Sequence, residues 1–228
     1  MRQLSICSVF ILTVFIFSCQ KSNSRNSGVA SLTIVNANFN APSIFVDFAD
    51  TTIPVYRIPA AISFGSFLEY GLMSGRTPFT MISSADTTKT LLQDTFNLLP
   101  AQSYSMYLAN NNSSADTFFM QDIIPFHTDS SAGVRFVNLL GDNQSVTINL
   151  SGSPLDQAEF SNLANKQATN FKSYPASNGI SSYNFVIRNK AMDSLATASW
   201  NLYLFKNSTI VLCQSGAGTI QVFQVNNF

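Results

Sequence analysis

The chain alternates between short apolar runs and short polar breaks. Within the runs, Val, Ile, Phe, Tyr and Thr often take every second position, as in Ser145–Leu150 and Thr219–Val225. A period of two places the apolar side chains on one face of a strand. The predicted strands are 32–36, 43–48, 78–83, 103–109, 133–138, 145–151, 183–188, 199–205, 208–213 and 218–225. Short strands at regular spacing predict an all-β fold made of antiparallel sandwiches.

One segment departs from the strand pattern. Residues 155–168 fit a short helix, with Asp156 and Glu159 near its start. Carboxylates are favourable in the first turn of a helix because they face the positive end of its dipole. This is the single stretch that could carry a short helix in a chain otherwise predicted to consist of strands.

The two halves of the chain echo each other. Residues 32–48 align without a gap over 134–150, and Asn36 matches Asn138. Two further echoes pair 62–70 with 163–171 and 104–108 with 200–204, again at a spacing of roughly 100 residues. The alignment predicts two tandem domains, at 30–126 and 130–228. About 95 residues per domain suits a seven-strand Greek-key sandwich.

These repeats carry a resemblance to a known family. The segments that carry it are Ile34–Ala37, Asn40–Asp47, Ser63–Ser66, Leu99–Tyr104 and Phe160–Ala164. They resemble a bacterial family of unknown function with the repeat pattern V-x-N/H-A-S-P-x-A-P-x-V-D-V. The resemblance is weaker in the second repeat, where Gly141-Asp142-Asn143-Gln144 replaces the proline-containing turn. It implies a two-repeat Ig-like envelope domain, often found on lipoproteins, and implies nothing about catalysis.

Residues 1–18 have the pattern of a secretory signal. Met1-Arg2 precede an apolar stretch from Ile6 to Phe17, which is too short for a transmembrane helix of about 20 residues. Because Ser18 is followed by Cys19, the leader resembles a bacterial lipoprotein signal. That resemblance implies cleavage before Cys19 and attachment of lipid to its thiol. The alternative is an ordinary secretory signal in which Cys19 has no role.

Residues 19–29 are expected to form the lipidated cysteine and a flexible tether, because Ser and Asn dominate them and no apolar period is present. Gln20 stands where an Asp would resemble an inner-membrane retention signal. We therefore expect a lipid anchor in the outer membrane. Whether the protein faces the periplasm or the cell surface stays open at this point.

Composition excludes some partners and limits covalent cross-links. Once Arg2 leaves with the leader, 11 basic side chains face 12 acidic ones, and no basic cluster marks a nucleic-acid site. Cys19 is reserved for lipid, so Cys213 has no partner for a disulfide. Cys213 lies in an apolar run and is expected to pack as a small buried hydrophobe.

The polar residues give no catalytic motif. The single histidine, His127, falls in the predicted connector, and Glu69 and Glu159 occupy matching places in the two repeats. Matching places indicate a structural role rather than a paired acid and base. No phosphate loop, dinucleotide motif or metal-ligand spacing is present in the sequence. We expect no enzyme activity, no metal and no cofactor.

Six of the ten Asp residues are followed by Ser or Thr, which is more than the composition predicts. Thr51, Thr87 and Ser194 lie in such pairs and resemble an O-glycosylation motif of envelope proteins. The structural alternative is turn chemistry, because Asp and Thr both hydrogen-bond to nearby backbone groups.

Loops at the ends of sandwiches are the expected binding elements. The candidate ligand residues are Tyr56 and Arg57 in loop 49–60, Phe118 and Phe119 in loop 110–120, and Tyr174 in loop 172–181. Loop 84–97 is a further candidate. The alternative for each aromatic residue is core packing, which we expect for Trp200 because it lies inside a predicted strand.

These observations predict a lipid-anchored, non-catalytic binding or assembly module of the cell envelope, with a protein or a glycan as partner. The alternatives are a structural spacer without a ligand, a carbohydrate-associated accessory lipoprotein, and an enzyme of a type that no motif reveals. Exposed aromatic residues in a concave patch would favour the binding module.

Overall fold

The computed structural model describes residues 28–48, 60–111, 114–141, 144–177, 179–216 and 218–227, and all of their regular elements are strands. The all-β prediction is confirmed. The predicted helix at 155–168 is wrong, since this segment forms β11 (Ala158–Leu163) and β12 (Gln167–Ala168). Phe160 lies opposite Ile148 and Leu163 lies opposite Val146, so a bulge on β11 turns two residues three positions apart towards the core.

The first half consists of two packed four-stranded sheets. The inner sheet has the order β4-β1-β7-β8, with bounds Phe67–Met73, Val29–Ala37, Ser103–Asn111 and Ser114–Asp122. The outer sheet has the order β3-β2-β5-β6, with bounds Ile62–Ser63, Ser43–Asp47, Gly75–Ser83 and Thr90–Leu98. Leu32, Ile44 and Met81 are fully buried between the two sheets. This arrangement is compatible with an Ig-like sandwich.

The second half repeats that strand order. Its inner sheet is β12-β9-β16-β17, with β13 also paired to β9, and its outer sheet is β11-β10-β14-β15. The bounds are β9 Ser131–Leu139, β16 Asn207–Gln214, β17 Ile220–Asn227, β13 Lys172–Pro175, β10 Val146–Leu150, β14 Ser182–Arg188 and β15 Ser194–Asn201. Trp200 is fully buried in this core, as expected.

Two expectations from the sequence need correction, one about strand direction and one about the alignment of the two halves. Most strand pairs are antiparallel, but β1 pairs parallel with β7, and β9 pairs parallel with β16. The structural counterpart of β7 is therefore β16. The alignment of 104–108 with 200–204 is wrong, because residue 200 lies in β15, whose counterpart in the first half is β6.

A buried asparagine has the same role in both halves. Asn36 Nδ2 donates to the carbonyls of Ala41 and Ile62, at 2.8 and 3.1 Å. Asn138 Nδ2 donates in the same way to the carbonyls of Gln144 and Leu163, at 2.8 and 2.9 Å. In each half the side-chain oxygen accepts the amide N–H two residues further on. Each asparagine thus joins the end of the first strand to the turns that follow it.

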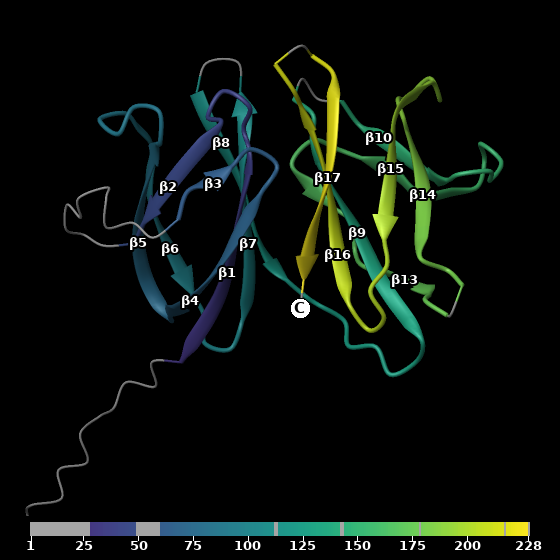
Figure 1. The fold of residues 1–228 in the computed structure, drawn as a ribbon, viewed down its shortest axis with the longest axis horizontal. Helices are drawn as coiled ribbons and strands as arrows, with labels where there is room; N and C mark the ends of the chain where they lie inside the picture. The colour runs from purple at the N-terminus through teal and green to yellow at the C-terminus, as the bar shows by residue number, and fades with distance from the viewer. Residues whose placement is uncertain are drawn as a thin grey trace, which may run out of the picture.

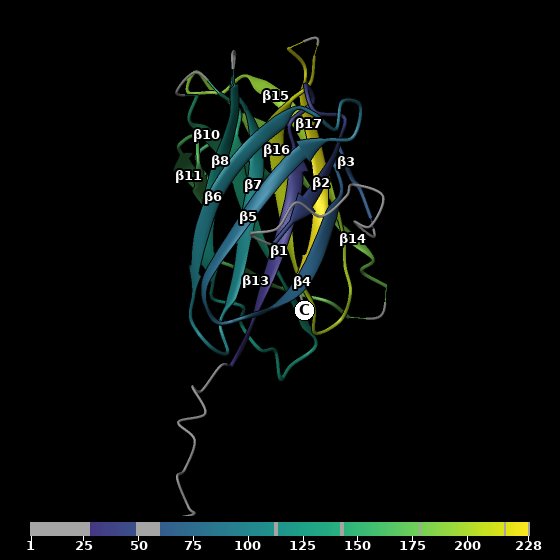
Figure 2. The same cartoon turned by 90° about the vertical axis from the view of Figure 1, so that its left-hand side faces the viewer.

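The two inner sheets pack on each other, so the four sheets form four layers (Figure 1). Figure 2 shows the same stack from the side, with β5 and β6 in front of β1 and β7. Val35 and Tyr107 from the first half meet Val137 and Val211 from the second in a third apolar core. Both faces of the inner sheets are therefore withdrawn from water, and all nine residues of β9 are buried.

The repeated asparagine generates a test of the fold. We expect Asn138→Ala to lower the free energy of unfolding by about 2–4 kcal/mol, because it leaves the buried Leu163 carbonyl, the partly buried Gln144 carbonyl and the buried Leu140 N–H without their side-chain partner. Asn184→Ala, on an exposed strand position, should change it by no more than about 0.5 kcal/mol. Urea denaturation measures both values, and equal effects would contradict the structural role of Asn138.

The buried thiol generates a second test. Burial raises the pKa of Cys213 to about 12, against 9.0 for a free thiol. The thiolate is the reactive form, so at pH 8 iodoacetamide should label native Cys213 at least about a thousandfold more slowly than in guanidinium chloride. A cysteine added at exposed Ser199 (Ser199→Cys) should label rapidly in the same molecule. Peptide mass spectrometry separates the two sites, and fast labelling of native Cys213 would contradict the packing.

Candidate binding site at the junction of the two halves

The connector between β8 and β9 contains His127, which is buried. Its Nε2 lies 2.9 Å from Asn207 Oδ1, and its Nδ1 lies 3.0 Å from Ser131 Oγ. Asn207 Nδ2 in turn donates to the carbonyl of Pro125 at 2.8 Å. A Cβ on Gly133 would lie 2.0 Å from Asn207 Oδ1, so only glycine admits this close approach. These bonds use both ring nitrogens of His127 to hold the connector.

A buried ion pair joins the two halves above the connector. Asp122 ends β8, Arg135 lies on β9, and both side chains are 2% exposed. Arg135 Nη2 donates to Asp122 Oδ1 at 2.5 Å, and Asp122 Oδ2 accepts the Ser105 hydroxyl at 2.7 Å. Arg135 Nε donates to Thr209 Oγ1 at 2.8 Å. Buried charges are stable only when they are satisfied in this way.

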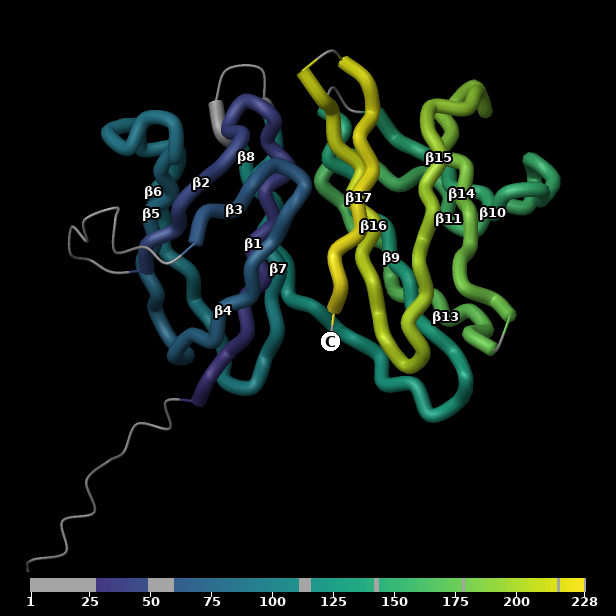
Figure 3. The backbone as a smooth tube through the Cα atoms, viewed as in Figure 1, coloured from purple at the N-terminus to yellow at the C-terminus, as the bar shows by residue number. Residues whose placement is uncertain are grey.

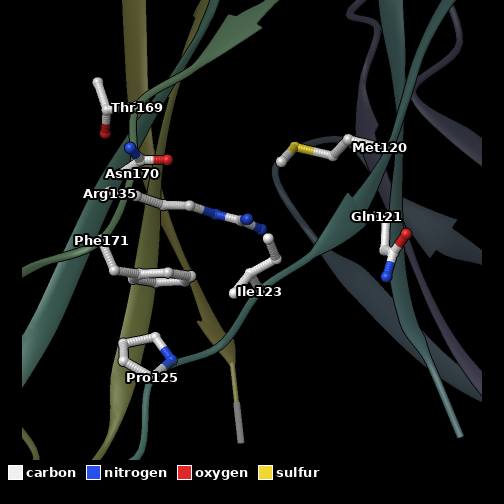
Figure 4. A pocket seen from close by; sticks show the side chains of 8 residues that line it. All are labelled: Met120, Gln121, Ile123, Pro125, Arg135, Thr169, Asn170 and Phe171. Carbon is white, nitrogen blue, oxygen red and sulfur yellow. The ribbon is translucent and has the colours of Figure 1, made fainter.

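Aromatic rings complete the surroundings of the guanidinium group. Arg135 lies over the ring of Phe171, 4.7 Å from its centroid (Figure 4). The Tyr107 hydroxyl lies 3.5 Å from Arg135 Nη2, and burial raises the pKa of Tyr107. The guanidinium group borders a shallow cavity of about 280 Å³ that Ile123 and Pro125 also line. Its charge is already matched by Asp122, so this cavity offers no free cation to a ligand.

A larger groove opens beside the connector. It has a volume of about 410 Å³ and lies between the turn before β7, the connector and the loop before β16. Phe126 is 90% exposed and Phe205 is 49% exposed, and both line the groove together with Gln102 and Ser103. We call this the junction groove. It is a concave site with aromatic walls and polar groups on one side.

The junction groove belongs to an end of the molecule that is unusually apolar. Among the described residues, nine of the eleven exposed large hydrophobic side chains lie at the start of β1, at the end of β4, in the turn between β6 and β7, in the connector, or in the loops before β14 and β16. Figure 1 draws these segments towards its lower end. They are Val29, Met73, Leu99, Ile123, Phe126, Ile180, Tyr203, Leu204 and Phe205. We call this set the apolar end. The described loops at the opposite end, such as 84–89 and 189–193, are rich in Ser, Thr, Asp, Asn and Lys.

The structure moves three predicted ligand residues out of loops. Phe118 and Phe119 lie on β8, where Phe118 stacks on Tyr107 and Phe119 stacks on Tyr104. Tyr174 lies on β13, is 7% exposed, and donates its hydroxyl to Glu159 at 2.5 Å. The predicted loops at 110–120 and 172–181 are therefore wrong where these strands lie. β8 pairs with β7, and β13 pairs with β9.

The remaining predicted residues divide into two groups. Cys19, Thr51, Tyr56 and Arg57 lie outside the described residues. Thr87 and Ser194 are exposed, so the structure leaves both accessible to a modifying enzyme. The Asp before Thr87 has a structural role in its turn. Asp86 Oδ1 accepts hydrogen bonds from the Thr88 hydroxyl and the Thr88 amide, at 2.6 and 3.1 Å. These bonds lower the pKa of Asp86.

Loop 84–97 was also a candidate, but only its first part is a loop, because β6 begins at Thr90. The predicted strand 199–205 is too long, because β15 ends at Asn201 and the apolar residues Tyr203, Leu204 and Phe205 are exposed. The sequence does hold a signal for this site. The runs Ile123-Ile124-Pro125-Phe126 and Leu202-Tyr203-Leu204-Phe205 are apolar yet lack the period-two pattern of a strand.

Neither sequence relatives nor a metal site identifies the function of this chain. No protein-family model matches the chain, and no curated protein matches it. The described residues hold no group of three or more His, Cys, Asp or Glu side chains that could bind a metal ion. They also include no helix long and apolar enough to cross a membrane.

The buried ion pair generates a test of the junction. We expect Asp122→Ala to destabilise the protein by about 3–5 kcal/mol, because it leaves Arg135 buried without a counter-charge. Asp116→Ala removes a partly exposed partner of Lys166 at the same junction and should cost about 0–1 kcal/mol. Urea denaturation compares the two variants. Similar losses would show that the Arg135–Asp122 pair does not hold the halves together.

Proposed function

We propose that this protein is a lipid-anchored, non-catalytic binding or assembly module of the outer membrane, and that it binds through its apolar end. The observation that carries the proposal is that exposed Phe126 and Phe205 line the junction groove, with exposed Ile123 in the same connector. Exposed apolar side chains gathered in this way mark interaction sites on soluble domains. The N-terminal lipid would hold this surface close to its partner.

A non-catalytic role agrees with how the polar groups at the junction are used. His127, Asp122 and Arg135 each bond to buried structural partners. A catalytic acid, base or nucleophile must instead reach a substrate in an open site. We therefore assign these residues to the support of the binding surface.

Two further functions have an observation in their favour. Gln102 and Ser103 beside the Phe126 ring give the junction groove the mixture of ring faces and polar groups that suits a glycan. The packing of the two inner sheets on each other and the buried ion pair between the halves would make the protein a stiff spacer. A spacer would have no need for the exposed side chains of the apolar end. Those side chains therefore favour the binding module over the spacer.

The anchor can be tested directly on the native protein. We expect the N-terminal peptide to begin at Cys19 and to carry the added mass of lipid, and the protein to be released from membranes only by detergent. Cys19→Ser should abolish both the lipid mass and the membrane retention, whereas Cys213→Ala should keep both. An unmodified Cys19 in the membrane-derived protein would refute the anchor.

A further inference from the structure

The apolar end and the N-terminal tether meet at the same pole of the molecule. β1 begins at Val29, which pairs with Met73, and the Val29 carbonyl accepts the amide of Ala101 in the turn after Leu99. The junction groove extends from that turn to the connector and the loop before β16. Figure 3 shows the connector crossing between the halves at this lower end. The first described strand therefore enters the fold within the apolar end.

The length of chain before β1 limits the distance between the lipid and the start of the fold. The ten Cα–Cα steps from Cys19 to Val29 can span at most about 36 Å. β1 has nine residues and is about 30 Å long. If the polar loops faced the lipid, the chain from Cys19 would have to run the whole length of the body to reach Val29. With the apolar end towards the lipid, no such run is needed.

We propose that the apolar end lies directly on the lipid surface of the membrane that holds the anchor, with Phe126 and Ile123 in the boundary between headgroups and acyl chains. This inference rests on the proposed lipid anchor. The strands then stand on the membrane, and the polar loops around Thr87 point away from it.

The shape and chemistry of the apolar end favour a bilayer over a protein partner. Ile123 is 84% exposed and Phe126 is 90% exposed, so these side chains project from the connector instead of lining a deep pocket. Tyr203, Leu204 and Phe205 project beside them from a separate loop. Aromatic and aliphatic side chains that project from loops at one pole suit the depth of about 5–10 Å at which interfacial segments bury in lipid.

A second consequence is that the contact depends little on lipid charge. The side chains of the apolar end supply apolar area, and one exposed basic side chain, Lys206, lies beside Phe205 in the junction groove. Apolar insertion is insensitive to screening, whereas attraction to anionic headgroups weakens with salt. Zwitterionic vesicles should therefore suffice as the membrane.

The experiment places a tryptophan at the apolar end of the full acylated protein. Phe126→Trp is compared with Leu155→Trp, which replaces an exposed apolar residue in the loop between β10 and β11, away from the apolar end. The proteins are reconstituted in phosphatidylcholine vesicles with and without brominated acyl chains, which quench only within the lipid. The native Trp200 is fully buried and supplies the common background.

We expect the added emission of the Phe126→Trp protein to shift to shorter wavelength and to fall by about half in brominated vesicles, at low and high salt. The Leu155→Trp protein should be unaffected. Absence of quenching in the Phe126→Trp protein, or equal quenching in both, overturns the inference. A blue shift that needs native envelopes and is absent from pure vesicles also overturns it and identifies a protein as the partner.

The mass of the N-terminal peptide is measured on the same samples. If Cys19 carries lipid and the Phe126→Trp protein is not quenched, the membrane contact fails while the proposed function stands. If Cys19 carries no lipid, the proposed function itself fails. The two failures are therefore distinguished in one preparation.

Discussion

The mutual burial of the two inner sheets is the constraint on which the other features depend. A sandwich with antiparallel sheets normally leaves one face of each sheet in water. Here each inner sheet is covered on one face by the outer sheet of its own half and on the other face by the inner sheet of the other half. Their polar groups must therefore be satisfied inside the protein. The bonds between Asp122, Arg135 and Thr209 meet this need and fix the relative position of the halves.

The same constraint determines where binding can occur. With the inner faces covered, the surface left for partners consists of the outer sheets, the strand ends and the loops. The outer strands expose mainly polar positions, as on β15, where exposed and buried residues alternate towards Trp200. Most of the exposed apolar residues are gathered at one pole, so the two ends of the body are chemically different although the two halves have the same strand order.

The sequence predicted features that depend on local periodicity and missed features that depend on distant pairing. Alternation in 145–150 and 219–225 identified β10 and β17, and the alignment of Asn36 with Asn138 identified two residues with equal hydrogen bonds. The burial of Cys213 followed from its apolar run. The pairing of Asp122 with Arg135 could not be read in this way, because only the fold places the end of β8 beside β9.

The proposed binding surface was missed for a physical reason of its own. Its apolar runs lack the period-two pattern of a strand, but that absence does not say whether their side chains are buried or exposed, because the strand bounds decide which occurs. At the connector, the bond from Asn207 to the Pro125 carbonyl holds the backbone in place, and the neighbouring Phe126 is left facing solvent. His127 supports Asn207 from the buried side. The junction bonds that join the halves therefore also present the apolar end, and damage to the buried network should disturb this proposed binding surface as well as stability.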